Sequence, residues 1–236
     1  MQRIYERAKI DVGLVGQTIN NSNATGNYYA AKKFRRALGI LQVGALAATK
    51  TAKLEIMEAT DVAGTGAQLI TGATATITAN TNVTELTIAL ATFLAASTIV
   101  INGLTFTAHA TTTTVANREF SISGSDTADG DALVTCINDA TYGVPGVTAS
   151  NNAGTVTLVA TDPGATLITA SSAGAATIAT TKAQAYVEVD GLQLSSGFTH
   201  IGCKVTSTGN GICAVTLLRT EERDVIVQKV GASAAA

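Results

Sequence analysis

Segments in which apolar and polar residues alternate lie near both ends of the chain, and a long stretch of different character separates them. Residues 52, 54 and 56 are apolar, and Lys53 and Glu55 lie between them. The same period of two returns over residues 183–189, 201–205 and 213–217. A period of two puts alternate side chains on opposite faces of a strand. Because a two-stranded hairpin is only marginally stable in water, we expect these segments to join in one antiparallel β-sandwich.

Two hairpins are predicted within this body. The apolar runs 38–43 and 52–57 flank a turn of small residues, and the strands 201–205 and 213–217 flank a turn at 208–211. The second hairpin would allow a disulfide between Cys203 and Cys213. An odd number of cysteines and the expected lack of a signal peptide favour free buried thiols instead.

The stretch between the alternating segments predicts an inserted α+β domain. Asn102-Gly103 separates two alternating runs, and both residues tolerate the positive φ of a type I′ turn, so a hairpin is expected there. A further strand is expected at 120–122, and a second hairpin at 147–159.

A helix is expected between that strand and the second hairpin. Its apolar residues recur at helical spacing, either Thr127 or Asp129 is suited to cap its start, and Tyr142 lies near its expected end.

The first thirty residues are polar and rich in asparagine, and no periodicity persists in them. We expect either an extended arm, ordered mainly by contact with another molecule, or a disordered terminus, and its deletion should not unfold the body. Near the other end, 219–224 is expected to be a charged bend and 225–227 a last short strand. The predicted fold is mainly β, with a sandwich or jelly-roll-like body. Its predicted parts are an arm at 1–33, a discontinuous body at 34–71 plus 180–230, an inserted domain at 72–179 and a flexible tail at 231–236.

Charge is distributed unevenly along the chain, although the net charge is only −2. Nine basic residues and two acidic residues occur up to Lys53, whereas the stretch 72–178 has seven acidic residues and one basic residue, Arg118. A net charge near zero gives no overall attraction to nucleic acid or to an anionic membrane. The longest apolar stretch is too short and too interrupted to span a bilayer. We therefore expect no direct nucleic-acid partner and no membrane partner.

No residue pattern points to catalysis, a cofactor or a metal. His109 and His200 have no neighbouring Cys, Asp or Glu at ligand spacing. Asp126, Asp129 and Asp131 are close in sequence, but a calcium loop needs a glutamate at its twelfth position, and that position is occupied by an isoleucine. We interpret these aspartates as belonging to a helix start and expect a protein that is not an enzyme.

One cluster is singled out as a candidate contact surface for a partner protein or for other copies of the chain. A basic cluster is usually a solvated edge, and here it would suit an acidic partner surface; nucleic-acid binding is a weaker interpretation, because the cluster lacks interleaved repeats. The candidate contact residues are Tyr28, Tyr29, Lys32, Lys33, Arg35 and Arg36.

Two parts of the sequence resemble bacteriophage proteins. The segments that begin Ile99-Val-Ile-Asn-Gly-Leu-Thr-Phe, Asp126-Thr-Ala-Asp-Gly-Asp-Ala-Leu and Val147-Thr-Ala-Ser resemble a small module that recurs in virion proteins of tailed phages. The frame around Lys53-Leu-Glu-Ile-Met-Glu-Ala-Thr-Asp-Val-Ala-Gly and its return at Tyr186-Val-Glu-Val-Asp resemble phage head decoration, or cement, proteins.

This resemblance implies a structural protein of the virion, made in the host bacterial cytoplasm and located on the outer surface of the capsid. The implied partners are the major capsid protein and further copies of the chain, with a trimer favoured. The same module also occurs in tail and fibre proteins, so a tail-tube, neck or fibre component is the alternative. A carbohydrate-binding or adhesion module is a second alternative, although aromatic residues, which stack on sugars, are scarce.

Overall fold

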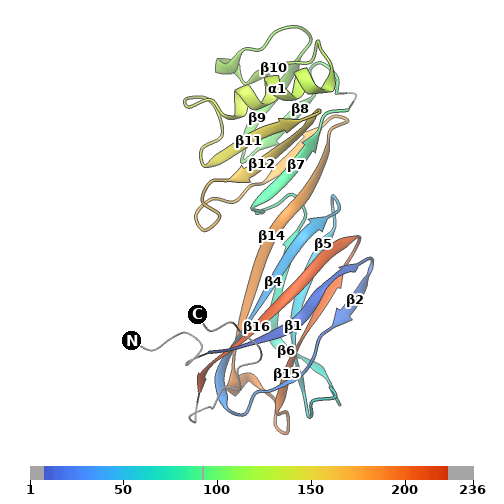
Figure 1. Cartoon of the computed structure of the whole chain (residues 1–236), viewed down its shortest axis with the longest axis vertical. Coiled ribbons are helices and arrows are strands. Elements are labelled where there is room, and N and C mark those ends of the chain that lie inside the picture. The colour runs from blue at the N-terminus through green and yellow to red at the C-terminus, as the bar shows by residue number, and fades with distance from the viewer. Residues whose placement is uncertain (1–7, 92, 223–236) are drawn as a thin grey trace, which may run out of the picture.

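The computed structural model describes residues 8–91 and 93–222, and it is mainly β with antiparallel sheets, which confirms the predicted fold class. Two lobes lie one above the other along the long axis of the molecule (Figure 1). The lower lobe, called the body here, is a sandwich of two sheets. Its larger sheet contains β1 (Ala8–Ile19), β16 (Gly211–Glu222), β4 (Phe34–Leu46) and β14 (Thr177–Asp190), in that order. Its smaller sheet contains β2 (Ser22–Thr25), β15 (His200–Ser207), β5 (Thr51–Ala59) and β6 (Gln68–Thr78), and β3 (Tyr29–Ala30) also pairs with β15.

The upper lobe, called the insert here, continues the larger sheet and adds another. Three of its strands extend the larger sheet beyond β14 to make seven strands in all: β7 (Glu85–Ala89), β12 (Thr155–Ala160) and β11 (Val147–Asn152). A separate sheet has the order β10 (Glu119–Ser121), β9 (Leu104–His109), β8 (Thr98–Ile101) and β13 (Ala170–Ala173). The short helix η2 (Val115–Asn117) precedes β10, the helix α1 (Asp126–Ile137) follows it, and η3 (Gly191–Gln193) follows β14 in the body.

The core of the body lies between its two sheets. Leu41, Leu54 and Ile56 are fully buried there, and they are inward positions of the alternating pattern. The sheets approach closely at Gly39, where an added Cβ would lie 2.6 Å from Cδ1 of Ile56. The alternation seen in the sequence therefore reports the buried face of β4 and β5 correctly.

Both hairpins predicted within the body are wrong. β4 pairs with β14 and β16 in the larger sheet, whereas β5 pairs with β6 and β15 in the smaller one. β15 and β16 are likewise in different sheets. Each connection crosses from one sheet to the other, so the paired apolar faces meet across the core. Alternation fixes which side chains point inward, but it does not reveal whether consecutive strands pair or face each other.

The predicted arm is also corrected by the structure. β1 pairs with β16 from Ala8 to Ile19, and β2 and β3 pair with β15. Two register shifts interrupt β1 on either side of Leu14. Each irregularity breaks the period of two, which explains why no strand pattern is visible there. Residues 1–7, and the predicted strand and tail after 222, lie outside the described residues.

Several predicted boundaries also move. β6 extends the body to Thr78, and β14 already begins at Thr177, so the insert is shorter than predicted. β16 continues into the predicted charged bend as far as Glu222, the last described residue. The helix α1 is capped by Ser125 rather than by Thr127 or Asp129, because the Ser125 hydroxyl accepts a hydrogen bond from the backbone N–H of Ala128. It ends at Ile137, before the predicted stop.

The insert packs around its own apolar core. α1 contacts β10, β11 and β12, and the rings of Phe93 and Phe120 stack with centroids 5.9 Å apart. The β8–β9 hairpin turns at Asn102 and Gly103, where φ is positive at both residues, as the sequence predicted. Among the described residues, no helix has the length and apolar character needed to cross a membrane.

A single strand, β14, belongs to both lobes (Figure 1). Its first residues pair with β7 of the insert, and among the described strands the residues from Ala183 to Asp190 pair with β4 of the body alone. Side chains strengthen this junction: the Thr180 hydroxyl accepts a hydrogen bond from the backbone N–H of Asn80 at 2.7 Å, and the amide of Asn80 donates to the Ile178 carbonyl at 3.1 Å. The lobes are therefore joined by a hydrogen-bonded sheet rather than by a linker.

Candidate interaction surface

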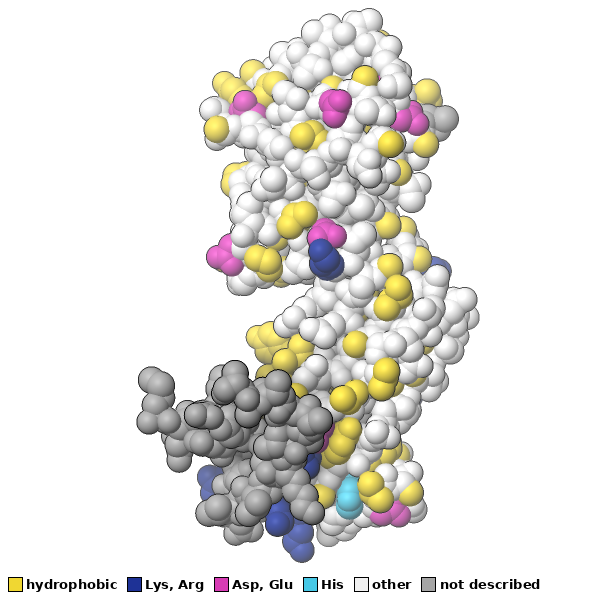
Figure 2. Space-filling model, viewed as in Figure 1, with side chains coloured by type: hydrophobic (Ala, Val, Ile, Leu, Met, Phe, Trp, Pro, Cys, Tyr) yellow, Lys and Arg dark blue, Asp and Glu magenta, His cyan; other side chains and the backbone are white. Residues whose placement is uncertain are grey.

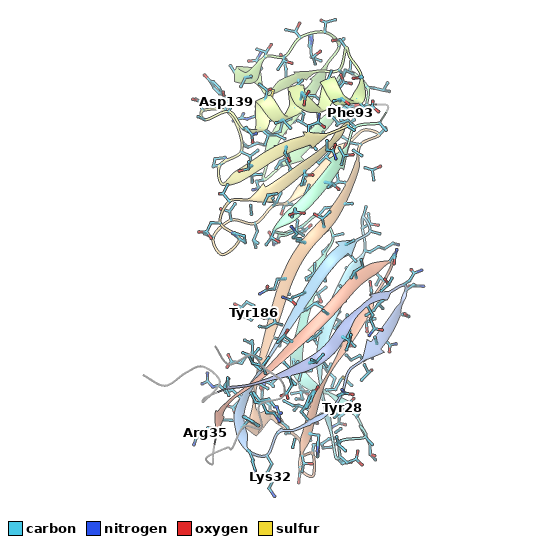
Figure 3. The ribbon with its side chains drawn as sticks, viewed as in Figure 1. Tyr28, Lys32, Arg35, Phe93, Asp139 and Tyr186 are labelled. Atoms are coloured by element: carbon cyan, nitrogen blue, oxygen red, sulfur yellow. The ribbon has the colours of Figure 1, made fainter. Side chains whose placement is uncertain are left out.

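Three basic side chains are exposed at the end of the body farthest from the insert. Lys32 and Lys33 lie in the turn before β4, and Arg35 lies at the start of that strand. Figure 3 shows Lys32 and Arg35 extending from this end of the molecule. Ala31 and Phe34 between them are buried, so the turn is anchored while its charges face solvent. We call Lys32, Lys33 and Arg35 the basic end.

Arg36, another of the predicted contact residues, is engaged within the chain. Its Nη1 lies 3.3 Å from Oε1 of Glu188 on the neighbouring strand β14, and both side chains are about half exposed. An exposed ion pair of this kind contributes little to stability. It does neutralise Arg36, which therefore adds little to the field of the basic end.

Tyr28 is an interior residue, and the prediction that it contacts a partner is corrected. Only 8% of its surface is exposed. Its ring packs against two glycines: a Cβ added at Gly64 or Gly202 would lie less than 3 Å from the ring. Burial raises the pKa of the Tyr28 hydroxyl, and the neighbouring Cys203 adds a smaller effect in the same direction. Its role is packing.

Tyr29 is part of a buried cluster around Arg219, which is only 3% exposed. The Arg219 Nε donates to Oδ2 of Asp11 at 2.6 Å, and its Nη1 donates to the carbonyl of Ala30. The guanidinium also lies over the rings of Phe34 and Tyr29, at 4.6 and 5.3 Å from their centroids. The Tyr29 hydroxyl donates to the carbonyl of Val12 at 2.7 Å.

This cluster, which sequence reasoning missed, holds the basic end in place. It links β1, β16 and the turn that carries the lysines, so the turn is fixed against the sheet by charge-assisted hydrogen bonds. Arg219 continues the alternating apolar run 213–217 at an inward position. An arginine at such a position was the sequence signal that could have revealed the buried cluster.

A shallow hollow of about 260 Å³ lies beside the basic end. Lys32, Phe34, Leu194 and Phe198 are among the residues that line it. Two aromatic rings and an aliphatic side chain next to a cation suit a partner segment that is both apolar and acidic. The hollow therefore enlarges the candidate surface beyond the charges themselves.

The residues considered for chemistry have structural partners. The His109 Nδ1 accepts hydrogen bonds from the backbone N–H groups of Thr111 and Thr112. Asp129 is buried and accepts from the N–H of Gly124, and Asp131 accepts from the amide of Asn151. Within residues 8–91 and 93–222, no group of three His, Cys, Asp or Glu side chains is placed to hold a metal ion.

The cysteines are buried free thiols, as the sequence favoured. Burial raises the pKa of Cys203 to about 12. Burial, with a smaller contribution from Asp139, raises the pKa of Cys136 to about 11. Because the thiolate is the reactive form, these cysteines are poor nucleophiles near neutral pH.

Comparison with known proteins adds no relative: no family model, curated protein or solved structure matches this chain.

Proposed function

We propose that this protein is a structural component of a phage virion, and specifically a decoration or cement protein that binds the outer surface of the head. The structural observation that carries the proposal is the exposed basic end, which lies at the opposite end of a mainly β molecule from an acidic lobe. The resemblance of the body and insert segments to phage head and virion proteins supports the same assignment.

The charges give the molecule two different ends. The insert contains seven acidic residues and one basic residue, Arg118, whereas the basic end contains three exposed cations. In the proposed arrangement the basic end and its hollow contact an acidic surface of the major capsid protein, and the insert projects outward. Figure 2 shows acidic side chains distributed over the insert and basic side chains at the opposite end of the molecule.

Repetition supplies the strength of attachment in this proposal. A single contact through three exposed charges is weak, because surface ion pairs contribute little and are screened by salt. Many copies that bind a lattice and also bind one another gain avidity without new kinds of contact. Homo-oligomers, with trimers as the form that the resemblance implies, would therefore hold the shell more firmly than single copies.

Copy number in purified particles tests the assignment. Quantifying this chain against the major shell protein should give hundreds of copies, close to a simple ratio with the shell subunit. A few copies, or a few tens, would instead indicate the tail-tube, neck or fibre alternative. Absence from particles would refute a virion role.

Charge neutralisation tests the proposed contact. Replacing Lys32, Lys33 and Arg35 with glutamine should reduce the affinity for undecorated shells at least tenfold at low salt. Added salt should reduce the difference in affinity between this variant and the wild type.

The matched control introduces three glutamates at Thr74, Thr76 and Thr78 on the outer side of β6, which changes the net charge by the same amount. Equal losses in the two variants would show that net charge, rather than the basic end, governs binding.

A further inference from the structure

The outer faces of the two body sheets differ in character, although both belong to one sandwich. On the smaller sheet the outward positions are mostly polar or charged. Cross-strand neighbours there include Glu55 beside Lys204 on β15 and Lys53 beside Thr206. The carboxylate of Glu55 lies 2.9 Å from Nζ of Lys53 and 3.6 Å from Nζ of Lys204. This face has the composition expected of a sheet in contact with water.

The outer face of the larger sheet is apolar at the corresponding places. Ile10 and Val12 on β1 are 58% and 56% exposed, and Tyr186 on β14 is 70% exposed. The strand register makes these residues neighbours of further apolar side chains: Ile40 lies opposite Tyr186 on the adjacent strand, and Leu38 and Leu218 lie opposite each other. We call these residues the apolar patch: Ile10, Val12, Leu38, Ile40, Tyr186 and Leu218.

The patch extends over four strands, with Thr216 inside one row and Glu188 at the β14 end of the other. Along one row, Tyr186, Ile40, Thr216 and Val12 are successive cross-strand partners, and along the next row Leu38, Leu218 and Ile10 follow one another. Directly opposed side chains of this kind are about 5 Å apart at Cβ. Hydrophobic side chains are seen over this part of the body in Figure 2, and the side chain of Tyr186 extends into open space in Figure 3. Apolar side chains gathered in this way mark an interaction surface.

An open strand edge borders the same face. From Ala183 to Asp190, β14 pairs with β4 on one side, and no described strand pairs with its other side. The register with β4 is unbroken over these residues, which contain neither proline nor lysine. Bulges, prolines and charged side chains, lysine above all, are the usual devices that prevent edge pairing. The charged residues in this half are Glu188, whose carboxylate is paired with Arg36, and Asp190 at its end, where the backbone N–H donates to the side chain of Gln193. The lower half of β14 therefore has the character of a pairing edge.

We propose that the apolar patch and the open edge of β14 form the surface through which this chain binds a second copy of itself. The charge balance favours a like partner: the charged residues Arg36 and Glu188 beside the patch form a pair, and Gln42 and Gln184 nearby are neutral. A nearly neutral apolar surface meets an identical surface without repulsion. The basic end, in contrast, repels its own copy and suits an acidic partner.

The size of the face is also adequate. Four strands spaced about 4.8 Å apart, over about ten residues of 3.3 Å each, cover roughly 20 by 30 Å. A specific protein interface of standard size buries about 800 Å² on each partner. A face of roughly these dimensions, together with the adjoining edge of β14, supplies an area of that order. This inference does not depend on the proposed role in the virion.

Sedimentation in solution tests the proposal without any capsid. The full chain at tens of micromolar should have a mass that is a multiple of 23.9 kDa. A variant with both Val12→Lys and Tyr186→Lys should raise the dissociation constant of self-association about 100-fold or more. The reason is that the new lysines of one copy would face those of the other across the interface. Both positions point outward, so thermal unfolding should remain cooperative in the variant.

The matched control is Thr76→Lys with Thr25→Lys, which places two lysines on the outer face of the smaller sheet and should leave the mass unchanged. A monomeric wild-type chain would overturn the proposal, as would equal masses for the patch variant and the wild type. If residues 223–236 cover the patch instead, the wild type will be monomeric and truncation after residue 222 will create self-association; that result also refutes the proposal.

Discussion

Arg219 and Glu58 show how two buried charges organise the body at the level of single residues. Arg219 has three kinds of partner: the carboxylate of Asp11, the carbonyl of Ala30 and two aromatic rings. Glu58, which is 1% exposed, accepts hydrogen bonds from the Gln68 amide at 2.6 Å and from the Ser195 N–H at 2.7 Å. The hydrogen bonds of each charged side chain join segments that are distant in sequence.

Replacing Arg219 with methionine should lower the free energy of unfolding by about 3–5 kcal/mol, because Asp11 then remains buried without its cation. Urea unfolding measures this change. The control is Arg36→Met, which removes an exposed ion pair and should cost about 1 kcal/mol or less. A double variant, Asp11→Asn with Arg219→Met, should recover part of the loss. Equal effects at the two arginines would contradict this account.

The stability of the body should fall in acid partly through Glu58. Burial alone would raise the pKa of this carboxyl, but the hydrogen bonds from Ser195 and Gln68 outweigh burial and hold the pKa below its usual value near 4.5. A lowered folded-state pKa stabilises the fold above the unfolded-state value, and this contribution is lost as the pH falls through the folded-state pKa. Urea unfolding between pH 6 and pH 3 should show a smaller decrease for Glu58→Gln than for the wild type. An identical pH dependence would rule out this contribution.

At the scale of elements, β1 is a structural strand and not a removable arm. β1 pairs with β16 from Ala8 to Ile19, and the side chains of Leu14 and Ile19 are buried. Asp11 and the Val12 carbonyl also complete the cluster around Arg219 and Tyr29. Binding of β1 therefore combines backbone pairing, apolar burial and charge.

Deleting residues 1–19 should destabilise the whole body. Burial of one large apolar side chain contributes about 1.5–3 kcal/mol, so two such residues with the lost Arg219 pair amount to more than about 5 kcal/mol. Thermal unfolding followed by circular dichroism would detect the decrease. A truncated chain that unfolds at the wild-type temperature would restore the interpretation of this segment as an arm.

The sequence predicted strands well wherever alternation is unbroken, as in β5, β15 and the part of β14 from Ala183 onward. It failed for β1 because two register shifts interrupt the period. It also failed to distinguish a hairpin from a connection that crosses between sheets, because both place the same side chains inward. Pairing is decided by contacts between distant segments, such as β4 with β14 and β16, and these are not encoded in a local pattern.

The candidate surface was predicted in part. Lys32, Lys33 and Arg35 are exposed because Ala31 and Phe34 anchor the turn around them. Tyr28 is interior, since two glycines bring the backbone close to its ring. The apolar patch could not be predicted, because its members come from four strands whose order in the sheet is a property of the whole fold.

At the scale of the whole molecule, charge and apolar surface are separated in space. The acidic insert, the basic end and the apolar patch occupy different parts of one rod-like shape (Figures 1 and 2). In the proposals above, one surface binds the shell and another binds further copies, so the two kinds of contact need not compete. A substitution in one surface should therefore leave binding through the other surface unchanged, so that the two kinds of binding can be measured separately.

The strand shared by the two lobes has a mechanical consequence. β14 runs along the long axis of the molecule, and its ladder with β4 extends from Thr180 to Asp190. Hydrogen bonds in an antiparallel ladder lie perpendicular to the strands. A pull on the insert along this axis therefore loads the ladder in shear, so that its bonds resist together instead of opening one after another. The tip of the molecule can thus transmit force to the body without separating from it.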